Sequence, residues 1–238
     1  MPDHQLEIEG FSIVALGNFN PTIFQPRWFA AHGLIREAEA DETNIEIIHR
    51  EATIFNAGWF KLQVTEGNFT IVTQDPTKPL PLRDLAIGTF KILEHTPLTA
   101  FGFNGVGHFK ASSEESWHKF GHHYAPKDSW EAVLKNPGLL KLVLEGKREG
   151  CDDRVQIQIE SSPANVLVMG IMIAVNQHRD ITKNVQGNAM TTQERNIAFI
   201  SGLQNDWDGF LQYAKVARNH LLTAGLSHSA KPAKKRKS

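Results

Sequence analysis

The sequence predicts an α+β protein with a mostly antiparallel sheet, helices packed on one face of that sheet and a long C-terminal helix. Three observations favour this class. Alternating apolar and polar residues mark several strands, stretches of helical period lie between them, and the regular strand–helix–strand repetition of a parallel sheet is missing. We expect one domain over residues 1–225, and place any division into two lobes near residues 145–153.

The clearest local pattern surrounds Glu66-Gly67, where apolar and polar residues alternate on both sides of this short break. Such a pattern predicts a β-hairpin. A two-residue loop would place Val64 opposite Phe69 and Leu62 opposite Ile71, because residues directly opposite on antiparallel strands point to the same face. The resulting apolar face needs a cover, which the predicted helices can supply.

Further strands are predicted wherever apolar residues alternate or run together between turn signals. The segment 166–175 is apolar on both faces and is therefore placed centrally in the sheet. The other predicted strands cover residues 11–16, 45–55, 98–109, 139–144 and 154–160.

Helices are predicted from apolar residues at helical spacing together with start and stop signals. The first starts at Pro26 and ends at Gly33, and the second covers residues 82–93 after a proline-containing loop at 75–81. A third starts after Ser113, and a fourth starts at Pro126 and carries Trp130, Val133 and Leu134.

The last helix is the longest. Thr191 and Glu194 have the order of a capping box, and apolar residues then recur at helical spacing until Gly225. An unbroken helix of this length would span about 50 Å. Gly202 and Gly209 are the positions at which we expect any kink.

Composition bounds the function classes. The chain has 238 residues, 41% of them hydrophobic and 21% charged, which is ordinary for a soluble globular protein, and its single cysteine suits the reducing cytoplasm. Its longest apolar run, residues 166–175, is shorter than a membrane span requires. The single cysteine, Cys151, rules out an internal disulfide and lies beside two aspartates, whose charges disfavour a reactive thiolate.

The C-terminal residues 226–238 lose all periodicity and are predicted to be a disordered basic tail. Lys234, Lys235, Arg236 and Lys237 form a cationic run that can attract nucleic-acid phosphates or act as a targeting signal. The same run would equally serve as a solvated chain end.

The sharpest candidate site lies in the segment Trp117–Tyr124. His118 and His122 are four residues apart, so on a helix they share a face and can chelate one metal ion. The spacing does not select a third ligand, for which the candidates are His108, His123, Asp128 and His178. His178 also lies two residues before Asp180, with which it could form an acid–base pair. A histidine-rich helix end without metal is the alternative, because the position after His118 is not the glutamate of a metalloprotease motif.

Aromatic residues suggest a docking surface. Phe24, Trp28 and Phe29 lie close together beside asparagines, and Trp207 and Phe210 belong to the long apolar stripe of the last helix. Exposed aromatic anchors are typical of protein interfaces. A core position for the same residues is the alternative. No phosphate-binding loop or nucleophile elbow is found, and the glycines at 102–107 have the wrong spacing for a dinucleotide fingerprint.

Three segments resemble those of sporadically distributed bacterial proteins of unknown function: FNPTIFQPRWF at 19–29, LEHTPLTAFGFN at 93–104 and NQH at 176–178. The resemblance implies a bacterial cytoplasmic protein, an accessory of a mobile-element or antiviral gene system. It implies no activity, cofactor or catalytic residue.

These observations lead to a hypothesis of a non-enzymatic binding or assembly protein that self-associates or docks a protein partner. One alternative is a metal-dependent hydrolase that uses His118 and His122. The other is a nucleic-acid-associated factor that acts through its basic tail.

Overall fold

The computed structural model describes residues 4–226, which form one nine-stranded antiparallel sheet in the order β2-β3-β4-β5-β1-β6-β9-β8-β7. The strands are β1 (His4–Gly17), β2 (Asn44–Ile48), β3 (Ala52–Asn56), β4 (Lys61–Thr65), β5 (Asn68–Thr73), β6 (Leu98–Ala111), β7 (Lys141–Gly146), β8 (Arg154–Ser161) and β9 (Gly170–Asp180). The helices are the 3-10 turn η1 (Pro21–Ile23) and α1 (Pro26–Ala31), α2 (Glu37–Asp41), α3 (Pro79–Ile92), α4 (Glu114–Tyr124) and α5 (Thr192–Leu226).

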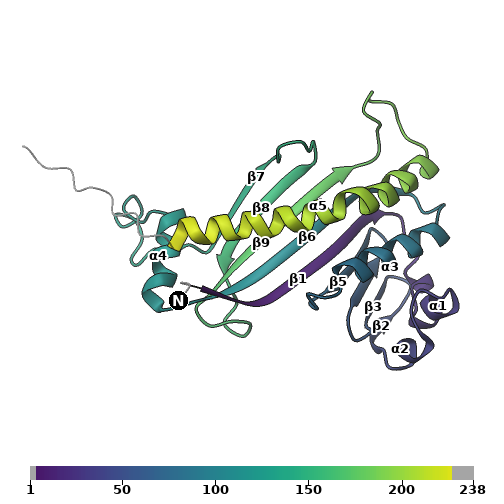
Figure 1. Ribbon diagram of the computed structural model, residues 1–238, viewed down its shortest axis with the longest axis horizontal. Coiled ribbons are helices and arrows are strands. Elements are labelled where there is room, and N and C mark those ends of the chain that lie inside the picture. The colour runs from purple at the N-terminus through teal and green to yellow at the C-terminus, as the bar shows by residue number, and fades with distance from the viewer. Residues whose placement is uncertain (1–3, 227–238) are drawn as a thin grey trace, which may run out of the picture.

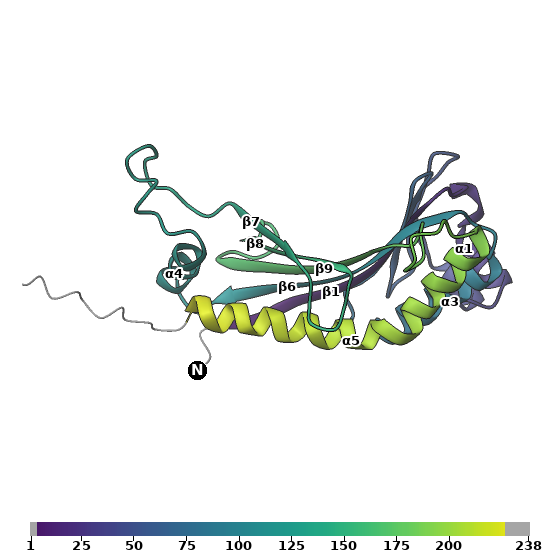
Figure 2. The ribbon, with the colours of Figure 1, turned by 90° about the horizontal axis from the view of Figure 1, so that it is seen from above.

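The helices α3 and α5 lie on the same face of the sheet, and α5 runs lengthwise along the central strand β6 (Figures 1 and 2). α5 has 35 residues, so it is about 52 Å long. In Figure 2 it curves with the sheet, and no helix of residues 4–226 lies across the opposite face. The predicted α+β class, with helices on one face and a long last helix, is confirmed.

Two halves of the chain repeat one topology around the central pair β1–β6. Each half begins with a long strand, continues with helix and an antiparallel meander, and ends with a helix on the covered face. The last meander strand pairs with the first strand in both halves, as β5 with β1 and β9 with β6. The halves differ at one place. The first has four meander strands and the second has three, because residues 125–140 form only turns where the first half has β2.

A large core fills most of the space between the sheet and its helices. Its largest buried side chains are aromatic, and edge-to-face contacts join them across elements, such as Phe90 with Phe199 and Phe103 with Trp207. Trp207 donates a hydrogen bond from Nε1 to the Pro79 carbonyl, 3.1 Å away, so its one polar atom is satisfied. A second cluster, around Phe120, lies under the last turns of α5.

Several local predictions are confirmed in detail. Val64 pairs with Phe69 and Leu62 with Ile71, as the two-residue loop requires. The Thr191–Glu194 capping box is present, with Thr191 N donating to Glu194 Oε2 at 2.7 Å.

The end of α1 and the place of β9 also agree with the sequence. Gly33 ends α1 with φ of 68°, a conformation that glycine adopts without steric cost. β9 lies between β6 and β8, an interior position in the sheet.

Other predictions are corrected. Residues 45–55 are not one strand but the hairpin β2–β3, with a turn at 49–51 that lacks the usual glycine or proline signal. The helix predicted from Pro126 is a series of turns, and its apolar side chains Trp130, Val133 and Leu134 are exposed instead of packed. β9 begins at Gly170 instead of residue 166, and α3 begins at Pro79, since proline is tolerated in a first helical turn.

The segment considered as a boundary between lobes, residues 145–153, comprises the end of β7 and the loop that connects it to β8, and these two strands pair in the same sheet.

Candidate functional site

Helix α4 forms one wall of a pocket at the end of the sheet. Ser113 caps the helix, with its hydroxyl accepting a hydrogen bond from Ser116 N at 3.1 Å. Glu114 and Glu115 lie in the first turn and two histidines in the last, an arrangement that complements the helix dipole. The capping signal was predicted from the sequence and is confirmed.

The pocket lies between α4, the turns of residues 127–139 and the paired ends of β8 and β9, and its volume is about 730 Å³. This is within the range of pockets that bind small molecules or the side chains of a partner. Apolar side chains from all three walls line it: Trp117, Phe120, Leu134, Leu139, Ile159 and Ile171. Four charged side chains accompany them: Lys127, Glu131, Lys135 and Glu160.

Two hydrogen bonds and one close packing contact fix α4 against its neighbours. Trp117 Nε1 donates to the Gly170 carbonyl at 3.2 Å, and Tyr124 Oη donates to the Leu221 carbonyl at 2.7 Å. Burial raises the pKa of the Tyr124 hydroxyl, so it remains a donor at neutral pH. The Phe120 ring packs on the backbone of Gly225, where an added Cβ would lie 2.5 Å from the ring. The pocket wall therefore rests directly on α5.

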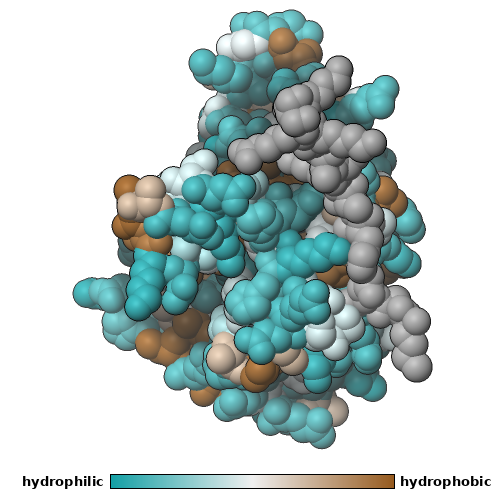
Figure 3. All heavy atoms as spheres, turned by 90° about the vertical axis from the view of Figure 1, so that its left-hand side faces the viewer, coloured by the Kyte–Doolittle hydropathy of each residue, from teal (hydrophilic) through white to brown (hydrophobic). Residues whose placement is uncertain are grey.

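The end of the molecule that carries α4 is shown in Figure 3. Most of this face is hydrophilic, with separate hydrophobic areas between the polar side chains. The exposed apolar residues near the pocket include Trp130 and Leu134, of which Leu134 is 53% exposed. Apolar groups at this end of the molecule are thus accessible to solvent.

The three histidines proposed as metal ligands are not brought together. His118 lines the pocket and lies 3.5 Å from Glu114, while the exposed His122 is not among the lining residues. His178 lies eight residues along β9 from Gly170, roughly 26 Å from the strand end that contacts α4. Within residues 4–226, no group of three or more His, Cys, Asp or Glu side chains could hold a metal ion.

His178 and Asp180 lie on the uncovered face of β9, where His178 is flanked by Gly102 and Arg154. Burial, and then the positive charge of Arg154, lower the pKa of His178. Asp180 accepts hydrogen bonds from Thr182 within its own turn, at 2.7 Å from the backbone N. Asp180 thus caps its own turn, and its charge acts to raise the pKa of His178 against the larger effects of burial and Arg154.

The aromatic docking surface is corrected, because four of its five residues belong to the core. Phe24, Phe29, Trp207 and Phe210 are at most 1% exposed, and only Trp28 is half-buried. The apolar stripe of α5 is buried against the sheet and α3, so it is not exposed for a partner. The basic run Lys234, Lys235, Arg236 and Lys237, and the tail at 227–238, lie outside the described residues.

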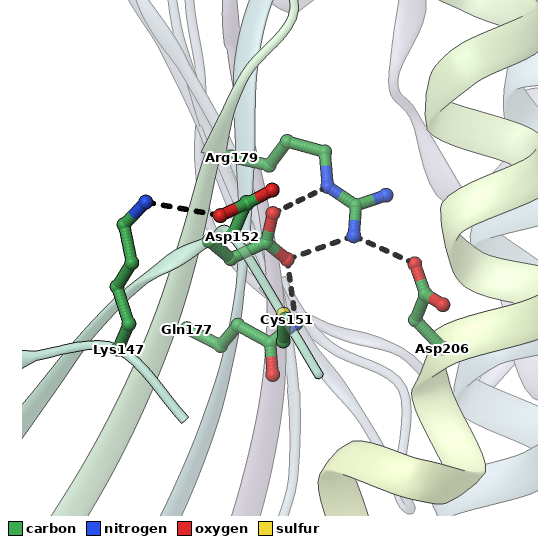
Figure 4. A network of polar contacts seen from close by, with 7 residues as sticks. Lys147, Cys151, Asp152, Gln177, Arg179 and Asp206 are labelled. Carbon is green, nitrogen blue, oxygen red and sulfur yellow. Dashed lines mark hydrogen bonds and ion pairs between the residues drawn. The ribbon is translucent and has the colours of Figure 1, made fainter. Parts of the chain in front are cut away.

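A buried polar cluster, which the sequence reasoning missed, joins the β7–β8 loop to α5 (Figure 4). Asp153, at the end of the loop, accepts hydrogen bonds from Arg179 Nε at 2.6 Å, Arg179 Nη2 at 2.8 Å and Gln177 Nε2 at 2.6 Å. Arg179 also contacts Asp206 of α5 at 2.8 Å. Gln177 further donates to Cys151 Sγ at 3.6 Å. One arginine thus connects loop, strand and helix.

Burial alone would raise the pKa of the Asp153 carboxyl, but the hydrogen bonds and charge of Arg179 outweigh it and lower the pKa below its ordinary value. Burial lowers the pKa of the Arg179 guanidinium, but the carboxylates of Asp153 and Asp206 raise it by more, so it lies above the ordinary value. Both groups are therefore ionised at neutral pH.

A row of polar side chains crosses the uncovered face of the sheet. The strand registers place Ser12, Asn104, Asn176, Gln156 and Glu145 side by side. Asn104 donates to Ser12 at 3.0 Å, Asn176 to Asn104 at 2.5 Å and Gln156 to Glu145 at 2.8 Å. These hydrogen bonds join β1, β6 and β9 in one group and β8 and β7 in another, so polar side chains pair across this face without an apolar cover.

The chain was compared with known proteins. No protein-family model matches the chain, and no curated protein matches it significantly. Among residues 4–226, no helix has both the length and the apolar character needed to cross a membrane.

Proposed function

We propose that this protein is a non-enzymatic binding protein that takes apolar groups of a partner into the pocket beside α4. The observation that carries the proposal is the composition of that pocket. Six apolar side chains and a few charged ones surround about 730 Å³, at an end of the molecule where other apolar side chains are exposed. A pocket lined mainly by apolar side chains, with a small number of polar groups, is typical of binding sites.

The geometry also favours binding because the walls come from elements with separate anchors. Ile159 and Ile171 belong to paired strands, and Phe120 rests on α5. The remaining wall, residues 127–139, consists of turns and irregular chain. An apolar floor fixed by paired strands, beside a wall of turns that carries both apolar and charged side chains, suits a docking role.

Titration with the apolar dye 8-anilinonaphthalene-1-sulfonate tests this proposal. The native protein is expected to bind the dye at one site with enhanced fluorescence. Leu134→Glu places a carboxylate in the pocket at a residue that is 53% exposed, so folding is retained. We expect dye affinity to fall about tenfold in this variant.

Val133→Glu is the matched control, because Val133 is the neighbouring residue, is 73% exposed and does not line the pocket. Its dye affinity is expected to equal that of the unmodified protein. Native protein that does not enhance the fluorescence, or equal weakening in both variants, would show that the pocket is not an apolar binding site.

A further inference from the structure

The edge strand β7 is a second exposed surface of the molecule, separate from the pocket beside α4. β7 is the last strand of the sheet and pairs only with β8, so in the described residues the backbone groups on its outer edge have no strand partner. Val143 is 43% exposed and Leu144 is 65% exposed. An open edge with apolar side chains is a template for pairing with another strand.

The internal repetition of the fold shows why this edge is open. In the first half, the strand that corresponds to β7 is β3, and β2 covers its outer edge. In the second half, residues 125–140 occupy the chain position of β2 but form turns. The second half therefore has one strand fewer, and the vacant place lies beside β7.

The sequence of β7 is complementary to itself. Antiparallel pairing of two copies centred on Val143 places Lys141 opposite the partner's Glu145 and Leu142 opposite the partner's Leu144. Leu142 and Leu144 lie on the helix-covered face, as their pairing with Ile159 and Ile157 shows, and Lys141, Val143 and Glu145 lie on the other. In this register each lysine lies opposite a glutamate, and each apolar residue lies opposite another apolar residue.

Neighbouring registers lack this match. Directly opposed residues must share a face, so the centre can move only by whole residues. Centring on Leu144 would place Val143 opposite Glu145, and centring on Leu142 would place Lys141 opposite Val143. The other sheet edge lacks this charge match, because Glu46 is the only charged residue of β2 and no register of two copies can place an opposite charge beside it.

We propose that two copies of this chain associate through β7, in antiparallel register about Val143, and form one continuous sheet. Glu145 can pair with Lys141 of the second copy through Oε1, because its contacts with Gln156 and Arg154 within the chain are both made by Oε2. The contact is closed by two-fold symmetry, so it yields dimers and no longer assemblies. Strand pairing alone is smaller than a standard stable interface of about 1,200 Å², so we expect a dissociation constant in the micromolar range.

Sedimentation equilibrium of the full chain tests the proposal by charge reversal. Lys141→Glu and Glu145→Lys each place like charges opposite one another twice in the dimer, and each is expected to weaken dimerisation at least about tenfold. An equimolar mixture of the two variants restores opposite charges at both positions. It is therefore expected to form a heterodimer, which no general loss of folding could produce.

Glu46→Lys, on the opposite edge strand, is the control and is expected to leave the dissociation constant unchanged. The proposal is overturned if the native protein remains monomeric at about 100 µM. It is equally overturned if Lys141→Glu dimerises as the native protein does, or if the mixture stays monomeric. This test is independent of the dye titration, so each proposal can fail alone.

Discussion

Asp153 is the residue on which the connection between the β7–β8 loop and α5 depends. Its side chain is 7% exposed and accepts three hydrogen bonds, two of them from Arg179. Asp153→Asn removes the charge but keeps the volume. We expect the free energy of unfolding to fall by about 2 kcal/mol, less than for a fully buried pair, because Arg179 is partly exposed and keeps Asp206. Urea denaturation at pH 7 measures this difference.

The same carboxylate predicts an acid dependence. The pKa of Asp153 in the folded protein lies below that of the unfolded chain, so the unfolded chain binds the proton at higher pH. The stabilisation is present above the unfolded pKa of about 3.9 and is lost as pH falls through the folded pKa. Urea denaturation at decreasing pH should show the native protein and Asp153→Asn converging in stability below pH of about 4.

Asp152→Asn is the control for both measurements, since Asp152 is the adjacent residue and its side chain is fully exposed. We expect its stability and acid dependence to match those of the native protein. Equal effects of the two substitutions would show that burial of Asp153 does not set the stability of the loop.

Residue-scale chemistry of this kind could not be predicted from the sequence. Asp153 and Arg179 are 26 positions apart, and no pattern in the sequence around either residue indicates that they meet. Their meeting depends on the register of β8 with β9, which no local pattern specifies. The histidine pair of α4 shows the converse case, since His118 and His122 were placed on a helix correctly but their third ligand depends on long-range geometry.

At the scale of elements, two glycines of α5 are expected to respond oppositely to the same substitution. At Gly202 an added Cβ would lie 2.5 Å from Cζ of the buried Phe101 ring. Gly202→Ala is therefore expected to lower the free energy of unfolding by about 1–2 kcal/mol, despite the better helix propensity of alanine.

At Gly209 the nearest atom to an added Cβ is Arg148 Nη2, 3.9 Å away at the end of a flexible side chain. Gly209→Ala is expected to raise the free energy of unfolding by up to about 1 kcal/mol. Thermal denaturation of the two variants and of the native protein measures both changes in stability. A change of the same sign in both would mean that packing against Phe101 does not decide the outcome.

The elements that the sequence predicted well are those with a complete local signal. The β4–β5 hairpin has alternation on both sides of a short loop, and α5 has a capping box followed by a sustained apolar stripe. The failures have incomplete signals. The turn at 49–51 contains no glycine or proline, and the segment after Pro126 has helical spacing but no core to bury its apolar residues. Spacing alone cannot supply the packing that stabilises most helices.

At the scale of the whole molecule, the two topologically similar halves are expected to unfold together. β1 and β6 pair along most of their length at the seam, and α5 packs against aromatic residues from both halves, Phe90 and Phe103 among them. Calorimetry should show one transition whose calorimetric and van't Hoff enthalpies agree. Two resolved transitions would mean that each half has an independent core.

The pocket has a further mechanical consequence through Phe120. The ring of this residue faces the pocket and also rests on the bare backbone of Gly225, while the neighbouring Tyr124 is bonded to the Leu221 carbonyl. A ligand that displaces the Phe120 ring must therefore also displace the last turn of α5, the helix that packs on the aromatic core of the other half. A fluorophore attached at that turn would thus sense occupancy of the pocket without standing in its entrance.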